Sequence, residues 1–203
     1  MSNIFFTSDT HWRHANILKF ESETRKFSSI EEHDEHLIET WNEFVKPSDT
    51  IYHMGDFCLA GVSRWIEILD RLNGNIHIIK GNHDRDKVVK RVLREGLIKE
   101  YYLIGHYMEV NGYILHLTHY PLEIGIRPKM FNVSGHIHSY ENNMINQLNC
   151  GVDSPIDYGL SKFGQPVHID QLVAKMDEIN PIMENLKEEQ RASGTWFKTD
   201  IKY

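Results

Sequence analysis

The sequence predicts an α/β protein built as a four-layer α/β/β/α sandwich, with two mixed β-sheets face to face between helices. Strand and helix patterns alternate through the first half of the chain, short strands dominate the second half, and a long helical segment follows them. With 203 residues and 23.9 kDa, the chain suits one domain over residues 1–203, whose C-terminal helix and tail occupy about 169–203.

In the first half, short apolar runs without turn residues predict strands, and apolar residues at helical spacing predict helices. Leu37, Trp41 and Phe44 form such a helical stripe, and Asn73-Gly74 is a typical helix-ending pair. The predicted strands are 3–8, 50–53 and 75–80, and the predicted helices are 32–45, 62–72 and 86–94.

In the second half, Asn111-Gly112 between two apolar segments predicts a hairpin. The expected helix at 169–191 contains Pro181, where a break is expected because proline lacks the backbone N–H. The polar tail 192–203 receives no assignment. The predicted strands are 101–104, 106–110, 113–117, 131–134 and 149–152.

Composition excludes several classes of protein. Hydrophobic residues at 40% and charged residues at 25% argue against disorder, and no apolar run reaches the roughly 20 residues of a membrane span. Residues 1–6 lack the pattern of a secretory leader, and two cysteines make no disulfide scaffold, so we expect a cytoplasmic protein without a membrane partner. The net charge of −7 argues against a long nucleic-acid duplex as partner.

Histidine is unusually frequent, with 13 in the chain, and many of these histidines follow predicted strands. Carboxylate, imidazole and amide groups together suit a divalent cation, and the absence of cysteine from these segments argues against a thiolate zinc finger. The strand ends carry Asp9-Thr10-His11, Gly55-Asp56, Gly81-Asn82-His83-Asp84, His119 and Gly135-His136-Ile137-His138.

The spacing within these motifs has a physical meaning. In an extended segment, residues two apart point the same way, so Asp9 with His11 and His136 with His138 could each face one cation. The glycines before Asp56, Asn82 and His136 are expected to allow the backbone to turn tightly or to approach a ligand closely.

These five motifs, in this order over residues 9–138, resemble the motif series of the calcineurin-like metallophosphoesterases. His119-Tyr120-Pro121 and Trp41-Asn42 extend the likeness to small bacterial and phage members. The resemblance implies a hydrolase that cleaves a phosphodiester or a phosphomonoester, with a small, nucleotide-type substrate expected.

The resemblance also implies a site for two divalent metal ions. Asp9, His11 and His138 would hold one, Asn82, His119 and His136 the other, and Asp56 would bridge them. A hydroxide bridging the metals would attack the phosphorus in line. Manganese is the metal expected to support activity, and nickel, iron, zinc or cobalt suit the same nitrogen and oxygen ligands.

His83 would protonate or stabilise the leaving alkoxide. The phosphoprotein-phosphatase branch has an Asp and an Arg after Gly-Asp and a Glu after Gly-Asn-His, but this chain has neither pattern. Asp84 would therefore serve as the catalytic partner of His83, or His83 has no carboxylate partner. The departure argues against a protein substrate.

Other polar residues are assigned by position alone. His14, Lys80 and Arg85 are candidates for substrate contact. His53 is expected to be packed or hydrogen-bonded inside a strand, and His33 to lie at the surface or at a strand edge. Two alternatives to a small-molecule phosphoesterase stay open: a nuclease acting on short or single-stranded nucleic acid, and a non-catalytic scaffold of the same fold that binds a protein partner. Retention of all eight motif residues argues against the scaffold. The sequence does not indicate an oligomeric state.

Overall fold

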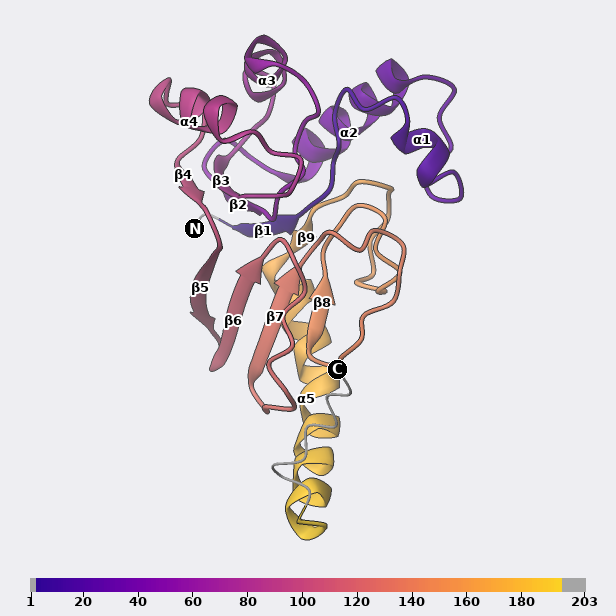
Figure 1. Ribbon diagram of the computed structural model, residues 1–203, viewed down its shortest axis with the longest axis vertical. Helices are drawn as coiled ribbons and strands as arrows, with labels where there is room; N and C mark the ends of the chain where they lie inside the picture. Colours follow the sequence, from indigo (N-terminus) through magenta and orange to yellow (C-terminus); the bar gives the residue numbers. More distant parts are fainter. Residues whose placement is uncertain (1–2, 195–203) are drawn as a thin grey trace.

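A computed structural model describes residues 3–194, and two mixed sheets form its centre (Figure 1). The strands are β1 (Ile4–Thr7), β2 (Thr50–His53), β3 (Asn75–Ile79), β4 (Glu100–Tyr102), β5 (Gly105–Val110), β6 (Tyr113–Thr118), β7 (Met130–Ser134), β8 (Gln147–Asn149) and β9 (Val167–His168). The helices are α1 (Ile17–Phe20), α2 (Ile30–Phe44), α3 (Val62–Leu69), α4 (Asp86–Arg94) and α5 (Ile169–Ala192).

The first sheet has the order β4-β3-β2-β1-β9, and the second has the order β5-β6-β7-β8. In the first sheet β1 to β4 run parallel and β9 is antiparallel to β1. In the second, β6, β7 and β8 run parallel, and β5 pairs antiparallel with β6. The predicted arrangement of two mixed sheets flanked by helices is thus confirmed.

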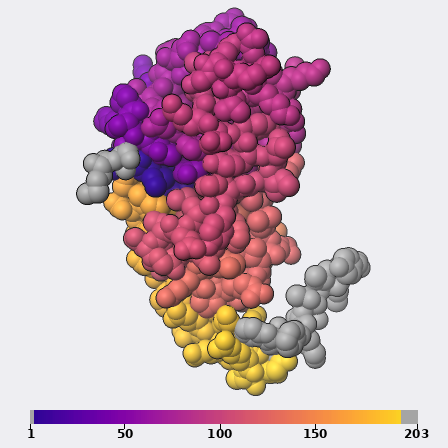
Figure 2. All heavy atoms as spheres, turned by 90° about the vertical axis from the view of Figure 1, so that its left-hand side faces the viewer, coloured from indigo at the N-terminus to yellow at the C-terminus, as the bar shows by residue number. Residues whose placement is uncertain are grey.

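Two hydrophobic clusters hold the layers together. Trp41 of α2, Trp65 of α3 and Val92 of α4 pack against one face of the first sheet, and all three side chains are buried. The second cluster lies on the other side of that sheet, where Phe6 and Ile79 meet Leu115 and Val133 of the second sheet and the buried face of α5. Figure 2 shows α5 extending past the body of the molecule.

Several element boundaries differ from the sequence-based expectation. The helix α2 begins at Ile30 because the Ser29 side chain accepts a bond from the Glu32 amide, a typical helix cap. The helix α5 continues through Pro181, with Met176 and Met183 both buried on either side of it, so the expected break is wrong. The elements α1 and β9 were not predicted, and β8 ends at Asn149, where a strand over 149–152 was expected.

Other expectations concern single features of the chain. Cys58 and Cys150 are free and buried, in agreement with the absence of a disulfide scaffold. None of the helices within residues 3–194 combines the length and apolar character that crossing a bilayer requires. Residues 195–203, most of the unassigned tail, lie outside the described part of the chain.

The loops after β2 and β3 are in direct contact, and Gly81 makes this possible. A Cβ atom at Gly81 would lie 2.2 Å from both the backbone nitrogen and Oδ1 of Asp56. No side chain fits there unless one loop moves, so Gly81 allows the two loops to approach each other closely.

We predict that Gly81→Ala destabilises the protein by about 1–3 kcal/mol, the usual range for an overpacked interior. Urea denaturation measures the change. Gly61→Ala is the matched control, because a Cβ at Gly61 has no atom within 4 Å and only its role as helix cap is changed, at a cost below about 1 kcal/mol. Equal stability of the two variants would show that the loops do not need this clearance.

Candidate metal centre

The predicted motif residues meet where the strands of both sheets end. Thr7 of β1 lies opposite His53 of β2, which lies opposite Ile78 of β3, so these parallel strands end at nearly the same level. A bridge between Ser8 and Gly151 ties the end of β1 to the segment after β8, and so joins the sheets. The motif loops of both sheets therefore face a common space.

The backbone at the ligand positions is left-handed rather than extended. Within residues 3–194, eight residues other than glycine have positive φ, and five of these are predicted ligands: Asp9 (57°), His11 (50°), Asp56 (55°), His136 (71°) and His138 (48°). The expectation that the D-x-H and H-x-H pairs are extended is wrong. Such a backbone costs of order 1–3 kcal/mol per residue and clusters at functional sites, where the surrounding fold holds it.

One group of ligand atoms surrounds Asp9. Nε2 of His11 and Nε2 of His138 each lie 4.0 Å from Oδ1 of Asp9, and His11 Nε2 lies 3.6 Å from Oδ2 of Asp56. Atoms that bind one cation at about 2.0–2.2 Å lie about 3–4 Å apart. The side chains of Asp9, His11 and His138 can therefore hold one metal ion, with Asp56 beside them.

A second group lies on the other side of Asp56. Nε2 of His119 is 3.6 Å from Oδ2 of Asp56 and 2.8 Å from Oδ1 of Asn82, and the ring of His136 is 5.0 Å from the ring of His119. Oδ2 of Asp56 thus faces both groups, as a bridging ligand requires. Asp9, Asp56 and His119 also offer atoms within 4.8 Å of one another.

The chemistry of these groups fits a cation. Oδ1 of Asp9 and Nε2 of His11 are buried and have no hydrogen-bond partner among the described residues. Burial raises the pKa of Asp9 and lowers the pKa of His11, because each charged form loses its hydration. His11 therefore stays neutral, which is the form in which imidazole binds metals. A cation would supply the positive partner that stabilises the ionised carboxylate of Asp9.

His83 and His14 lie at the open side of the centre. The His83 amide donates to Oδ1 of Asp56 at 2.8 Å, and its ring, 46% exposed, places Nε2 4.0 Å from Oδ2 of Asp56. The His14 ring lies 5.3 Å from the ring of His11 and 6.4 Å from that of His83. Both rings can face a substrate that approaches the metal site.

The structure gives Asp84 a supporting position. Its carboxylate accepts bonds from the amides of Gly81, Asp56 and Phe57 at 2.9–3.0 Å, and no hydrogen bond joins it to the His83 ring in the described part of the chain. Burial raises the pKa of Asp84 to about 6. The expected partnership of Asp84 with His83 is absent from this geometry, and we assign Asp84 to holding the two loops together.

The two predicted basic contacts differ. The ammonium group of Lys80 forms an ion pair with Asp86 at 2.7 Å, so it is held at the start of α4. Arg85 lines a cavity of about 320 Å³ together with Asn82, His83 and Cys58. Arg85 therefore borders the same cavity as His83 and the predicted ligand Asn82.

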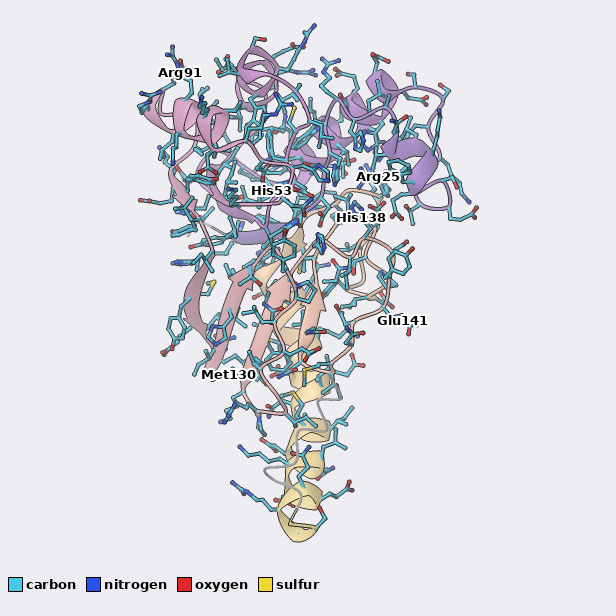
Figure 3. All side chains as sticks on the ribbon, in the orientation of Figure 1. Arg25, His53, Arg91, Met130, His138 and Glu141 are labelled. Carbon is cyan, nitrogen blue, oxygen red and sulfur yellow. The ribbon has the colours of Figure 1, made fainter. Side chains whose placement is uncertain are left out.

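A buried network behind the site was missed by the sequence reasoning. Figure 3 labels two of its members, Arg25 and His138. Nδ1 of His138 lies 2.9 Å from Oδ2 of Asp153, and Asp153 forms an ion pair with Arg25 at 2.5 Å. Arg25 also contacts His33, which is fully buried within α2, so the expected position of His33 at the surface or a strand edge is wrong. His53 is buried and bonded to Thr10 at 2.9 Å, as expected. Asp153 follows the strand predicted at 149–152, so the strand-end rule could have found it.

Comparison with known proteins gives one consistent result. Residues 2–179 match the sequence profile of the calcineurin-like phosphoesterases. An uncharacterized protein of Methanocaldococcus jannaschii is 35% identical over 155 residues, which cover 70% of this chain and 86% of the relative. The gene 66 protein of Mycobacterium phage D29 is 38% identical over 88 residues, 42% of each chain.

A solved structure of a protein of unknown function from Aquifex aeolicus shares the fold, with a TM-score of 0.66 and 23% identity over 86% of this chain and 99% of that one. The family implies divalent metal ions, and the Asp and His side chains above could hold them. The five motifs, their convergence and the match over residues 2–179 lead to one conclusion: the chain belongs to the calcineurin-like phosphoesterase family.

Proposed function

We propose that this phosphoesterase binds two divalent cations and hydrolyses a small phosphodiester or phosphomonoester of nucleotide type. The observation that carries the proposal is the position of Asp56, whose Oδ2 atom lies 3.6 Å from His11 Nε2 on one side and 3.6 Å from His119 Nε2 on the other. Asp9 and Asp56 are the two carboxylates among the seven candidate ligands. Of these two, Asp56 has the oxygen that lies near histidines of both groups.

Each side of Asp56 has its own set of ligands. Asp9, His11 and His138 would hold one cation, and Asn82, His119 and His136 the other. Two divalent cations would supply Lewis-acid charge for the phosphate and lower the pKa of a water molecule toward 7. Manganese suits these nitrogen and oxygen ligands, as do nickel, iron, zinc and cobalt.

The residues of the chain perform the remaining tasks. His83 has its backbone fixed on Asp56 and its ring at the open side, where it can donate a proton to the leaving oxygen or stabilise the charge there. Arg85 lies in the adjoining cavity and can bind phosphate oxygens, because a guanidinium donates to two oxygens at once.

Exposed aromatic side chains around the centre support a nucleotide-type substrate. Tyr120 is 52% exposed, and its ring makes an edge-to-face contact with the His136 ring, with 4.5 Å between the ring centroids. Phe20 is 69% exposed and lies 6.0 Å from the His14 ring, and Tyr140, 74% exposed, follows His138 by two residues. Aromatic rings in such positions can stack on a base, with about 1–3 kcal/mol per stacked base.

The first prediction from this proposal tests the metal centre and separates an enzyme from a scaffold. Manganese-loaded protein should contain two manganese ions per chain by elemental analysis and should hydrolyse bis-p-nitrophenyl phosphate only with metal. Asp56→Asn should lose metal and more than about 100-fold in rate, because loss of even an outer partner of a ligand costs 10–100-fold. Asp170→Asn, at an 85% exposed carboxylate, is the control. A firm ratio of one ion or fewer would contradict the two-cation proposal.

The second prediction concerns His83. His83→Ala should keep both metals and lose about 10²–10⁴-fold in rate on an alkyl diester, whose leaving group needs a proton. The loss should be smaller on a nitrophenyl diester, since nitrophenolate leaves with little charge to neutralise. Rates at equal metal occupancy measure the difference. Equal losses on both substrates would favour an orienting role, and loss of metal would make His83 a ligand.

The third prediction concerns the aromatic rim. Phe20→Leu and Tyr120→Leu should lower kcat/KM for a nucleoside p-nitrophenyl phosphate by about 5- to 100-fold, because each removes a stacking surface. Methyl p-nitrophenyl phosphate has the same leaving group without a base, so its hydrolysis should change little. Tyr107→Leu, at a 50% exposed tyrosine on β5, is the matched control. Parallel losses on both esters would argue against base stacking.

A further inference from the structure

The Arg25–Asp153 ion pair contacts both segments that supply the Asp9, His11 and His138 ligand group. Both side chains are fully buried, and they come from the loop after α1 and from the segment after β8, 128 positions apart in the chain. Neither residue belongs to the five motifs. The position of this pair therefore needs its own explanation.

Asp153 contacts the histidine from behind. Its Oδ2 atom lies 2.9 Å from Nδ1 of His138, on the opposite side of the ring from Nε2, which faces Asp9. When Nδ1–H donates to a carboxylate, the proton stays on Nδ1 and the lone pair of Nε2 is free for a metal. Thr24 donates to Oδ1 of Asp153 at 2.6 Å, which fixes the carboxylate in turn.

Arg25 holds the other segment. Its Nη2 donates to the carbonyl of Asp9 at 2.6 Å, and its Nη1 donates to the carbonyl of Thr10 at 3.1 Å. Asp9 has a φ of 57°, so these bonds fix a backbone conformation that is unfavourable by itself. One guanidinium thus positions the Asp9–His11 turn and the carboxylate that orients His138.

The second ligand group is supported differently. Nδ1 of His119 lies 2.7 Å from the backbone carbonyl of Met54, so its orientation is fixed by the backbone directly after β2. The Arg25–Asp153 pair shares no bond with His119, His136 or Asn82 among the described residues. Its influence should fall on one ligand group.

From this arrangement we propose that Asp153, held by Arg25 and Thr24, is a positioning residue that sets the affinity of the Asp9–His11–His138 site for its cation. The proposal rests on the proposed two-cation site. In this proposal, different residues position the ligands of the two cation sites. The affinity of one site can therefore be lowered without changing that of the other.

The test is a titration of the full chain with manganese, in which calorimetry and electron paramagnetic resonance measure the binding. Wild type should show two binding steps. Asp153→Asn should weaken one step by about 10–100-fold and leave the other unchanged, because an amide either accepts more weakly from Nδ1–H or donates to Nδ1 and moves the proton to Nε2. In metal-free protein with ¹⁵N-labelled histidine, wild type should show the proton of His138 on Nδ1, and in the variant this Nδ1–H signal should be weakened or replaced by an Nε2–H signal.

Two further variants keep the outcome unambiguous. Glu21→Gln is the matched control, because a carboxylate oxygen of Glu21 lies 3.9 Å from the same His138 nitrogen, beyond hydrogen-bond distance. This variant should leave both binding steps unchanged. Thr24→Val removes one bond to Asp153 without removing a buried charge, and should weaken the same step by less than tenfold. If Asp153→Asn does not fold, Thr24→Val decides by the same criterion.

Two results would overturn the proposal in favour of a purely structural ion pair. One is that both binding steps are unchanged in Asp153→Asn and in Thr24→Val. The other is that both steps weaken equally and the metal-free protein melts at a lower temperature. A single step in wild type would instead contradict the two-cation function. The ¹⁵N signature of His138 would then still report whether Asp153 sets its proton position.

Discussion

Two buried carboxylates, Asp9 and Asp56, share the small space where the sheets meet, and the other features of the site follow from this crowding. Both are nearly inaccessible to solvent, and they offer oxygen atoms within 4.8 Å of each other. Like charges in a dry interior repel strongly, and burial adds the loss of hydration. Cations between neutral imidazoles would offset both costs. The acidic chain would thus present positive charge to a phosphate at this one place.

This arrangement demands an unusual backbone, which the fold stabilises from outside. The left-handed turns at the ligand positions are unfavourable locally, but the chain around them is tied into both sheets. The Asp9 amide donates to the carbonyl of Gly55 and the His11 amide to that of Asp56, both at 3.0 Å. Asp84 holds the loops after β2 and β3 together from beneath. Regular strands thus provide the rigidity, and their ends provide the chemistry.

Much of the fold could be predicted from the sequence, because hydrophobic periodicity reports burial directly. The strand at 50–53 and the helix at 86–94 are found at their expected bounds. The two-residue strand β9 is too short to carry a pattern, and Pro181 stays inside α5 because tertiary packing of Met176 and Met183 outweighs the local preference. Strand-end motifs could indicate the ligands, but not their left-handed backbone. Nothing local marks Arg25, whose partner Asp153 lies 128 residues away.

The most direct test of this account is anomalous diffraction from manganese-loaded crystals at the manganese absorption edge. We predict two peaks, one beside Asp9, His11 and His138 and the other beside Asn82, His119 and His136, with an Asp56 oxygen within coordination distance, about 2.0–2.2 Å, of both. A single peak, or two peaks that do not share Asp56, would contradict the central claim that this carboxylate organises a two-cation site.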